Sequence, residues 1–142
     1  MGRDKDERLA ALRRVSLFRL CKDKELADIA KLCSETTFAP GTEITVEGDA
    51  SADAYVVLEG RADVSVRGEK IAIAGDGDII GEMSLLDGGV RSATVTAVTE
   101  VQALVLNPTQ FADLLDRHGS VARLLMVELA RRLRERVDAP AY

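Results

Sequence analysis

Residues 54–75 read AYVVLEGRADVSVRGEKIAIAG, in which three short apolar runs each end at a glycine. Polar and apolar residues alternate within ADVSVRG, residues 62–68, which is typical of a strand with one exposed face. Glycine suits the turns because it has no Cβ to clash when φ is positive. Short strands joined by glycine turns in this way predict a closed or rolled antiparallel sheet.

The same pattern extends on both sides of this stretch. TEITVEG precedes it at residues 42–48, while SATVTAV and EVQALVL follow it at residues 92–98 and 100–106. We therefore expect the β-roll to occupy residues 36–106.

Helices are expected before the roll. Leu9, Leu12 and Val15 recur at helical spacing, and residues 22–35 carry a second apolar stripe. Asp23 is the expected N-cap of that second helix. Residues 1–35 are therefore predicted to form an N-terminal helical segment.

The sequence after the roll again shows features typical of helices. Asn107 followed by Pro108 predicts a helix start, because an Asx cap precedes proline in the first helical position. Gly119 is expected to end this helix, and Ser120 to cap a last helix whose apolar residues continue to Val137. Residues 107–137 are thus predicted to contain two C-terminal helices.

These elements predict one α+β domain over residues 1–142, with an antiparallel, jelly-roll-like β-roll flanked by N-terminal helices and two C-terminal helices. The chain has 142 residues, the size of a single domain. Hydrophobic residues make up 46% and charged residues 30%, which suits a globular core.

The composition argues against several function classes. A net charge of −5 does not suit a nucleic-acid binder, and the arginines within residues 131–136 fit a solvated helix face. One histidine, His118, and two cysteines give neither a metal motif nor a catalytic triad, so no metal, cofactor or enzyme activity is expected. No apolar run is long enough to cross a membrane, and the charged start does not resemble a secretory signal, which predicts a cytoplasmic location.

Residues 81–97, GEMSLLDGGVRSATVTA, interrupt the β pattern with a segment that suits a single helical turn. A helix N-terminus offers unpaired N–H groups to an anion. Arg91 would add a bidentate phosphate contact, whereas Glu82 repels phosphate and would accept hydrogen bonds from a pair of sugar hydroxyls. The stretch predicts a pocket for a small anionic sugar phosphate. In the ligand-free alternative, Glu82 and Arg91 pair with each other and close the loop.

This stretch resembles the phosphate-binding cassette of cyclic nucleotide-binding domains. The resemblance covers nearly the full chain, because it includes the helical lead-in, FAPGTEITVEGD at residues 38–49, YVVLEGRADV at 55–64 and the two closing helices. It implies cyclic AMP or cyclic GMP as a ligand rather than as a cofactor. The ligand-binding positions that it implies are Gly81, Glu82, Met83, Ser84, Arg91, Ser92, Ala93, Arg132 and Arg136.

The resemblance also implies a role for each position. Glu82 would accept from the ribose 2′-hydroxyl and Arg91 would pair with the cyclic phosphate, as would the backbone amides of residues 83 and 84 and the amide or hydroxyl of residue 92. Gly81 would allow close approach of the backbone. The last helix would form a lid from which Arg132 or Arg136 reaches the purine.

The implied function is that of a sensor or regulatory domain in which ligand binding moves the C-terminal helices. Leu85 would transmit the change to Phe111. The effector protein is unknown, and the last helix would also suit a homodimer. Three alternatives stay open: a regulatory fragment of a channel or enzyme, a ligand-free interaction module of the same fold, and a fragment of a cyclic AMP-regulated transcription factor. The last of these requires DNA-reading helices beyond Tyr142.

Overall fold

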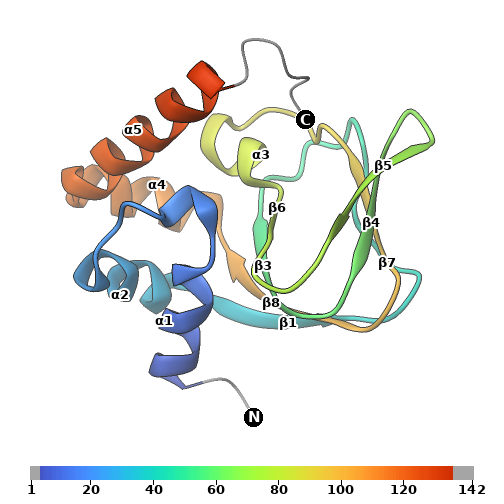
Figure 1. Cartoon of the computed structure of the whole chain (residues 1–142), viewed down its shortest axis with the longest axis horizontal. Coiled ribbons are helices and arrows are strands. Elements are labelled where there is room, and N and C mark those ends of the chain that lie inside the picture. Colours follow the sequence, from blue (N-terminus) through green and yellow to red (C-terminus); the bar gives the residue numbers. More distant parts are fainter. Residues whose placement is uncertain (1–3, 136–142) are drawn as a thin grey trace.

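The computed structural model describes residues 4–135, and within them two four-stranded antiparallel sheets form the predicted roll (Figure 1). The strand order is β1-β8-β3-β6 in one sheet and β2-β7-β4-β5 in the other. The strands are β1 (Ser34–Phe38), β2 (Glu43–Thr45), β3 (Ala54–Glu59), β4 (Ala62–Val66), β5 (Glu69–Ala74), β6 (Ile79–Ile80), β7 (Thr94–Ala97) and β8 (Val101–Leu106). The α+β prediction is confirmed.

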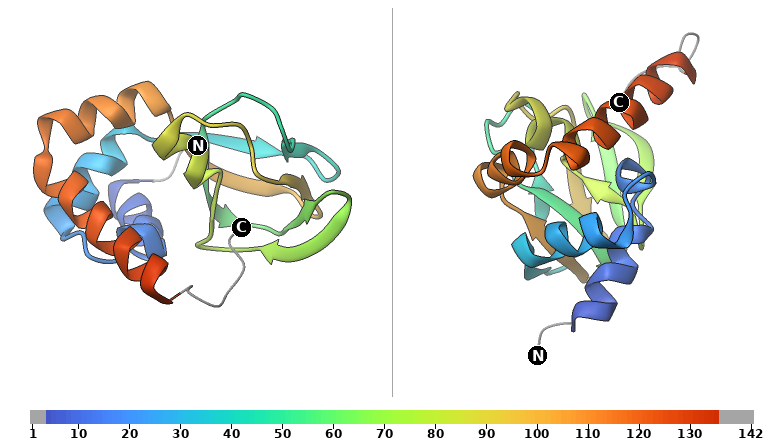
Figure 2. Two further views of the ribbon diagram at one scale, coloured as in Figure 1. Left: turned by 90° about the horizontal axis from the view of Figure 1, so that it is seen from above. Right: turned by 90° about the vertical axis from the view of Figure 1, so that its left-hand side faces the viewer.

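The helices gather on one side of the roll, and α3 lies close to the sheets (Figures 1 and 2). They are α1 (Lys5–Arg13), the 3₁₀ helix η1 (Ser16–Phe18), α2 (Asp23–Leu32), α3 (Glu82–Asp87), α4 (Pro108–Arg117) and α5 (Gly119–Glu135). This arrangement places the N-terminal helices beside α4 and α5, although they are far apart in sequence.

Two of the predicted helix caps are wrong. Asp23 is the first residue of α2, and Lys22 is the N-cap, whose backbone N–H donates to a carboxylate oxygen of Glu25 at 2.8 Å. Ser120 lies within the first turn of α5, because that helix already begins at Gly119. The predicted cap is one residue late for α2 and two residues late for α5, because in each case the residue with the better capping side chain was favoured.

The predicted start of α4 is confirmed. The Asn107 side chain accepts hydrogen bonds from the backbone N–H groups of Thr109 and Gln110 at 2.9 and 3.1 Å. Pro108 follows in the first helical position, where its missing N–H costs no helical hydrogen bond.

A hydrophobic core joins the helices to the β1-β8-β3-β6 sheet. Phe18 and Phe111 pack with their ring centroids 6.3 Å apart, and Leu85 of α3 is buried in the same cluster. A second cluster fills the space between the two sheets and includes Val57, Val95 and Val101. The cassette is thus attached to the helical layer through Leu85, as the resemblance implied.

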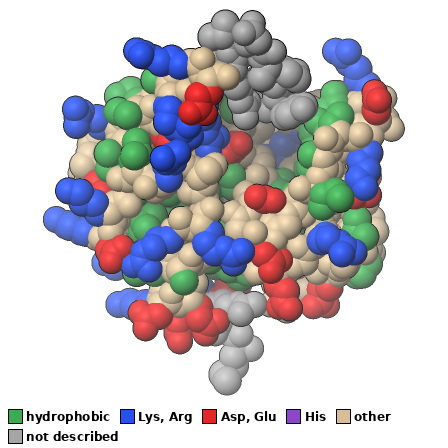
Figure 3. All heavy atoms as spheres, in the orientation of Figure 1, with side chains coloured by type: hydrophobic (Ala, Val, Ile, Leu, Met, Phe, Trp, Pro, Cys, Tyr) green, Lys and Arg blue, Asp and Glu red, His purple; other side chains and the backbone are tan. Residues whose placement is uncertain are grey.

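Charged side chains of both signs lie on the visible surface (Figure 3). On the face shown in Figure 3, Lys and Arg side chains are interspersed with Asp and Glu rather than gathered in one basic patch. Within residues 4–135, no helix combines the length and apolar character needed to cross a membrane. The same residues contain no group of three or more His, Cys, Asp and Glu side chains placed to hold a metal ion.

Candidate functional site

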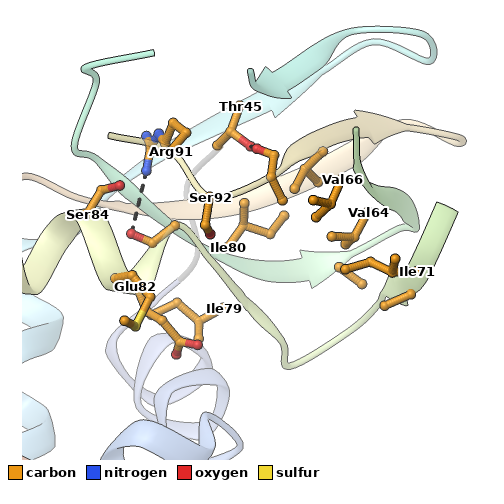
Figure 4. Close-up of a pocket in the computed structure, with 16 residues that line it drawn as sticks. Thr45, Val64, Val66, Ile71, Ile79, Ile80, Glu82, Ser84, Arg91 and Ser92 are labelled. Carbon is orange, nitrogen blue, oxygen red and sulfur yellow. Dashed lines mark hydrogen bonds between the residues drawn. The ribbon is translucent and has the colours of Figure 1, made fainter. Parts of the chain in front are cut away.

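A pocket lies between the start of α3 and the β2-β7-β4-β5 sheet (Figure 4). Glu82, Ser84 and Arg91 lie at one end, while Val64, Val66 and Ile71 lie at the other (Figure 4). The lining residues are Thr45, Val64, Val66, Ile71, Ala72, Ala74, Ile79, Ile80, Gly81, Glu82, Met83, Ser84, Arg91, Ser92, Ala93 and Val95. The pocket is therefore polar at one end and apolar at the other.

Arg91 is 3% exposed and is held by neutral groups. Its Nε donates to Ser51 Oγ at 3.1 Å, and its Nη2 donates to the Asp53 carbonyl at 2.6 Å. Its Nη1 makes a long contact of 3.5 Å with the Gly81 carbonyl, which is drawn as a dashed line in Figure 4. These contacts fix the guanidinium plane but do not neutralise its charge.

Among the described residues, no carboxylate forms an ion pair with Arg91. Burial lowers the pKa of the Arg91 guanidinium, and the potentials of Tyr55, Asp53 and Asp49 only oppose this effect. A charge buried in this way is costly unless a counter-ion accompanies it. The direct Glu82–Arg91 ion pair of the ligand-free alternative is not formed among the described residues, and an anion in the pocket would be a suitable counter-ion for Arg91.

Gly81 makes room for Arg91. Its φ is +81°, and a Cβ at this position would collide with the Arg91 guanidinium and lie 3.0 Å from the Asp53 carbonyl oxygen. Glycine is thus needed here both for its backbone conformation and for its lack of a side chain.

Gly81→Ala is expected to destabilise the fold by more than the roughly 1–2 kcal/mol that a left-handed conformation costs a residue with a Cβ. Gly88→Ala is the matched control, because φ at Gly88 is +70° but an added Cβ meets nothing within 4 Å. Urea unfolding of both variants measures the difference. Equal losses of stability would show that Arg91 moves aside without cost.

Ser84 and Glu82 face the pocket from α3. Ser84 is 2% exposed, and its hydroxyl lies on the Arg91 side of the pocket (Figure 4). Glu82 is the first residue of α3, and its Oε2 lies 3.6 Å from Nη1 of Arg132 on α5. Met83, between them, is exposed and lines the pocket through its position on α3.

The remaining wall is formed by residues that follow Arg91, namely Ser92 and Ala93 before β7 and Val95 within it. Ser92 is exposed to the pocket, and the Ala93 carbonyl accepts a hydrogen bond from Thr45 Oγ1 at 3.0 Å. Arg91 is also tied to the preceding loop through its backbone, because its carbonyl accepts from Gly48 N–H and its N–H donates to the Asp49 carbonyl. The segment that would meet a phosphate is therefore held rigidly.

Sequence reasoning missed the groups that hold Arg91. Ser51 and Asp53 lie some forty residues upstream, and Asp53 contributes only a backbone carbonyl. Every residue has a backbone carbonyl, so the sequence does not indicate which one will support Arg91. The polar run GDASAD at residues 48–53, between two strand patterns, is the one available hint of a functional loop.

Of the two arginines expected to contact the ligand from the last helix, the structure describes only one. Arg132 contacts Glu82, Glu128 and Ser16 in the structure, at the α3 end of the pocket. Arg136 lies outside the described residues. The structure also reveals Glu128 on the same helix, a carboxylate with no exposed surface.

The family model named "Cyclic nucleotide-binding domain" matches residues 35–118. The cyclic AMP receptor protein of Thermus thermophilus is 37% identical over 103 residues, which cover 69% of this chain and 48% of that protein. A CRP-like cAMP-activated global transcriptional regulator of Mycobacterium tuberculosis is 26% identical over 128 residues, which cover 87% of this chain and 57% of that protein. The chain thus spans about half the length of these relatives.

A solved structure shows the same fold over almost its whole length. The N-terminal domain of a transcriptional regulator from Streptomyces coelicolor A3(2) superposes with a TM-score of 0.82 at 37% identity, covering 93% of this chain and 98% of that one. Because the family model covers more than half of the chain and the pocket coincides with the cassette, the chain belongs to the cyclic nucleotide-binding domain family.

Proposed function

We propose that this chain binds a cyclic nucleotide monophosphate in the pocket between α3 and the sheet and acts as a sensor rather than as an enzyme. The observation that carries the proposal is Arg91, a guanidinium that is 3% exposed and that forms no ion pair with a described carboxylate. A cyclic phosphodiester carries one negative charge, which matches this single cation. The names of the relatives, which include cAMP-activated regulators, support the same ligand class.

The phosphate end would be formed by Arg91, Ser84 and Ser92. The observed contacts use three of the five N–H groups of Arg91, so one on each Nη stays available for two phosphate oxygens. The backbone amides of Met83 and Ser84, in the first turn of α3, would face the same phosphate. Ala93 would complete the wall behind it.

The apolar end would hold the purine between Val64, Val66 and Ile71 (Figure 4). These side chains offer contact area but no hydrogen bond to distinguish one purine from another. Both cyclic AMP and cyclic GMP are therefore candidate ligands, and the relatives favour cyclic AMP. Titration calorimetry with both nucleotides tests the proposal, and a folded chain that binds neither would overturn it.

Glu82→Ala is expected to weaken cyclic AMP binding roughly 10- to 100-fold, because a hydrogen bond to a charged group contributes about 1.5–3 kcal/mol. The same change should affect 2′-deoxy cyclic AMP much less, since that analogue lacks the hydroxyl that Glu82 would accept from. Calorimetric titration of both ligands into both proteins measures the difference. Equal losses for the two ligands would show that Glu82 does not bind the ribose.

Ligand binding would be transmitted through Leu85. This residue lies in the same buried cluster as Phe111 of α4, so an ordered cassette would shift α4 and α5 together. A ligand shifts such an equilibrium only by its differential affinity for the two states. The output would reach an effector through α5, whose exposed Met126, Val127 and Leu133 also suit a homodimer.

Two transcription regulators among the relatives favour a second, related candidate, in which this domain controls a DNA-binding segment. The same ligand site serves both cases. Nucleic acid would then contact the attached segment and not the described surface, whose visible face mixes both signs of charge (Figure 3).

A further inference from the structure

Glu128 is a carboxylate with no exposed surface near the middle of α5. It accepts hydrogen bonds from Nη2 and Nε of Arg131 at 2.6 and 3.1 Å and from Nε of Arg132 at 3.3 Å. Nε of Arg19, just after η1, lies 3.7 Å from Glu128 Oε1. Glu128 therefore fixes the orientation of two guanidinium groups on its own helix.

Each of the three side-chain nitrogens of Arg132 contacts a residue of a different helix. Its Nε contacts Glu128 of α5, its Nη2 donates to Ser16 Oγ of η1 at 2.7 Å, and its Nη1 lies 3.6 Å from Glu82 Oε2 of α3. The Arg132 side chain is only 16% exposed. Because a guanidinium is planar and rigid, fixing two of its nitrogens determines where the third one lies.

The third nitrogen lies beside the residue that would bind the ribose. Glu82 also lies near the place where the phosphate charge would be, and two negative groups in one pocket repel each other. A positive charge next to Glu82 offsets this repulsion and orients the carboxylate. Arg132 thus has the geometry and the charge to support ribose binding without contacting the ligand.

We propose that Arg132 is the positioning residue for Glu82, that Glu128 and Ser16 set its orientation, and that α5 senses the ribose subsite through it. This inference rests on the proposed function, because it requires a ribonucleotide in the pocket. Coupling is reciprocal: if Arg132 strengthens ribose binding, ribose binding strengthens the attachment of α5 to α3 by the same factor.

Arg131 provides a matched control for Arg132. Both arginines bind Glu128, but the second partner of Arg131 is Glu135 on the same helix, whereas that of Arg132 is Glu82 in the pocket. A purely structural role in holding α5 would therefore affect both variants alike. A role in positioning Glu82 would affect only Arg132.

The test titrates cyclic AMP and 2′-deoxy cyclic AMP into the wild type, Arg132→Gln and Arg131→Gln. We expect Arg132→Gln to weaken cyclic AMP binding roughly fivefold, which is the low end of the affinity changes typical of two coupled sites. The affinity for the 2′-deoxy analogue should stay within about twofold of the wild-type value. Arg131→Gln should change neither. In the double variant Glu82→Gln/Arg132→Gln, the loss should equal that of Glu82→Gln alone.

Several outcomes would overturn the inference. Equal losses for both ligands, equal effects in both arginine variants, or additive losses in the double variant would each leave Arg132 with a structural role only. If Arg132→Gln does not fold, Arg132→Lys replaces it, since lysine keeps the charge but not the three-way geometry, and the same ligand-specific loss is expected. If the folded wild type binds neither ligand, the proposed function itself fails, which is a distinct result.

Discussion

Arg91→Ala is expected to weaken cyclic nucleotide binding at least tenfold and to bring it near the detection limit of calorimetry. A charge-assisted hydrogen bond to phosphate contributes about 1.5–3 kcal/mol, and about 1.4 kcal/mol corresponds to one decade in affinity. Two such bonds would be lost at once, because the observed contacts leave one N–H on each Nη available to the phosphate. The buried position of Arg91 strengthens the effect, since water does not screen the charge there.

The fold should survive this change. Arg91 has no ion-pair partner among the described residues, so its removal takes away a desolvated charge and leaves no uncompensated carboxylate. Arg91→Lys keeps a charge but loses the planar fork, and we expect it also to bind poorly. A folded Arg91→Ala variant with unchanged affinity would remove the central observation behind the proposed function.

Glu128→Ala is expected to destabilise the fold by roughly 3 kcal/mol, the low end of the cost of breaking a buried ion pair. The carboxylate has no exposed surface, and its loss leaves Arg131, Arg132 and Arg19 close to one another without their shared anion. For a chain of this size the expected fall in Tm is roughly 10 °C. Thermal and urea unfolding of the variant and the wild type measure it.

The effect of Glu128 should depend on pH. Hydrogen bonding from Arg131, with a smaller contribution from Arg132, lowers the pKa of Glu128 below its usual 4.5, although burial acts in the opposite direction. A lowered pKa in the folded state contributes stability that is fully present above pH 4.5 and is lost as the pH falls below it. The stabilities of the wild type and Glu128→Ala should therefore converge in acid.

Glu135→Gln serves as the control for Glu128→Ala. Glu135 also pairs with Arg131, but its side chain is 62% exposed, and exposed pairs contribute little. Its replacement should change stability by less than about 1 kcal/mol. A similar loss in both variants, or a gap between Glu128→Ala and the wild type that does not close in acid, would show that Glu128 acts through packing rather than through its charge.

The roll and the phosphate cassette could be predicted from the sequence because their signals are local. Glycines at turns such as Gly48, Gly60 and Gly68 require positive φ, and all three adopt it in the structure. The run from Gly81 to Arg91 carries its chemistry within a few residues. Local patterns of this kind can be predicted because each residue type directly limits the backbone conformation at its own position.

The groups that complete the site could not be predicted because they come together only through tertiary packing. Asp53 supports Arg91 through a backbone oxygen, and Ser16 reaches Arg132 from 116 positions away. Glu128 and Arg132 are four positions apart, a spacing that equally suits an ion pair on the exposed face of a helix. The burial of Glu128 results from the docking of α5 on η1, which no single-helix pattern encodes.

Arg91 is the buried cation at the polar end of the pocket in the part of the chain that the structure describes, and under the proposed function it would also determine how a signal stops. Opening the cyclic phosphate by hydrolysis gives a phosphomonoester, whose charge at neutral pH approaches two. Arg91 balances only one of these charges, and the second would lie near the carboxylate of Glu82. If the proposed function holds, a pocket that favours the ring would disfavour the ring-opened product. Degradation of the messenger would then empty the site, even when the product accumulates beside it.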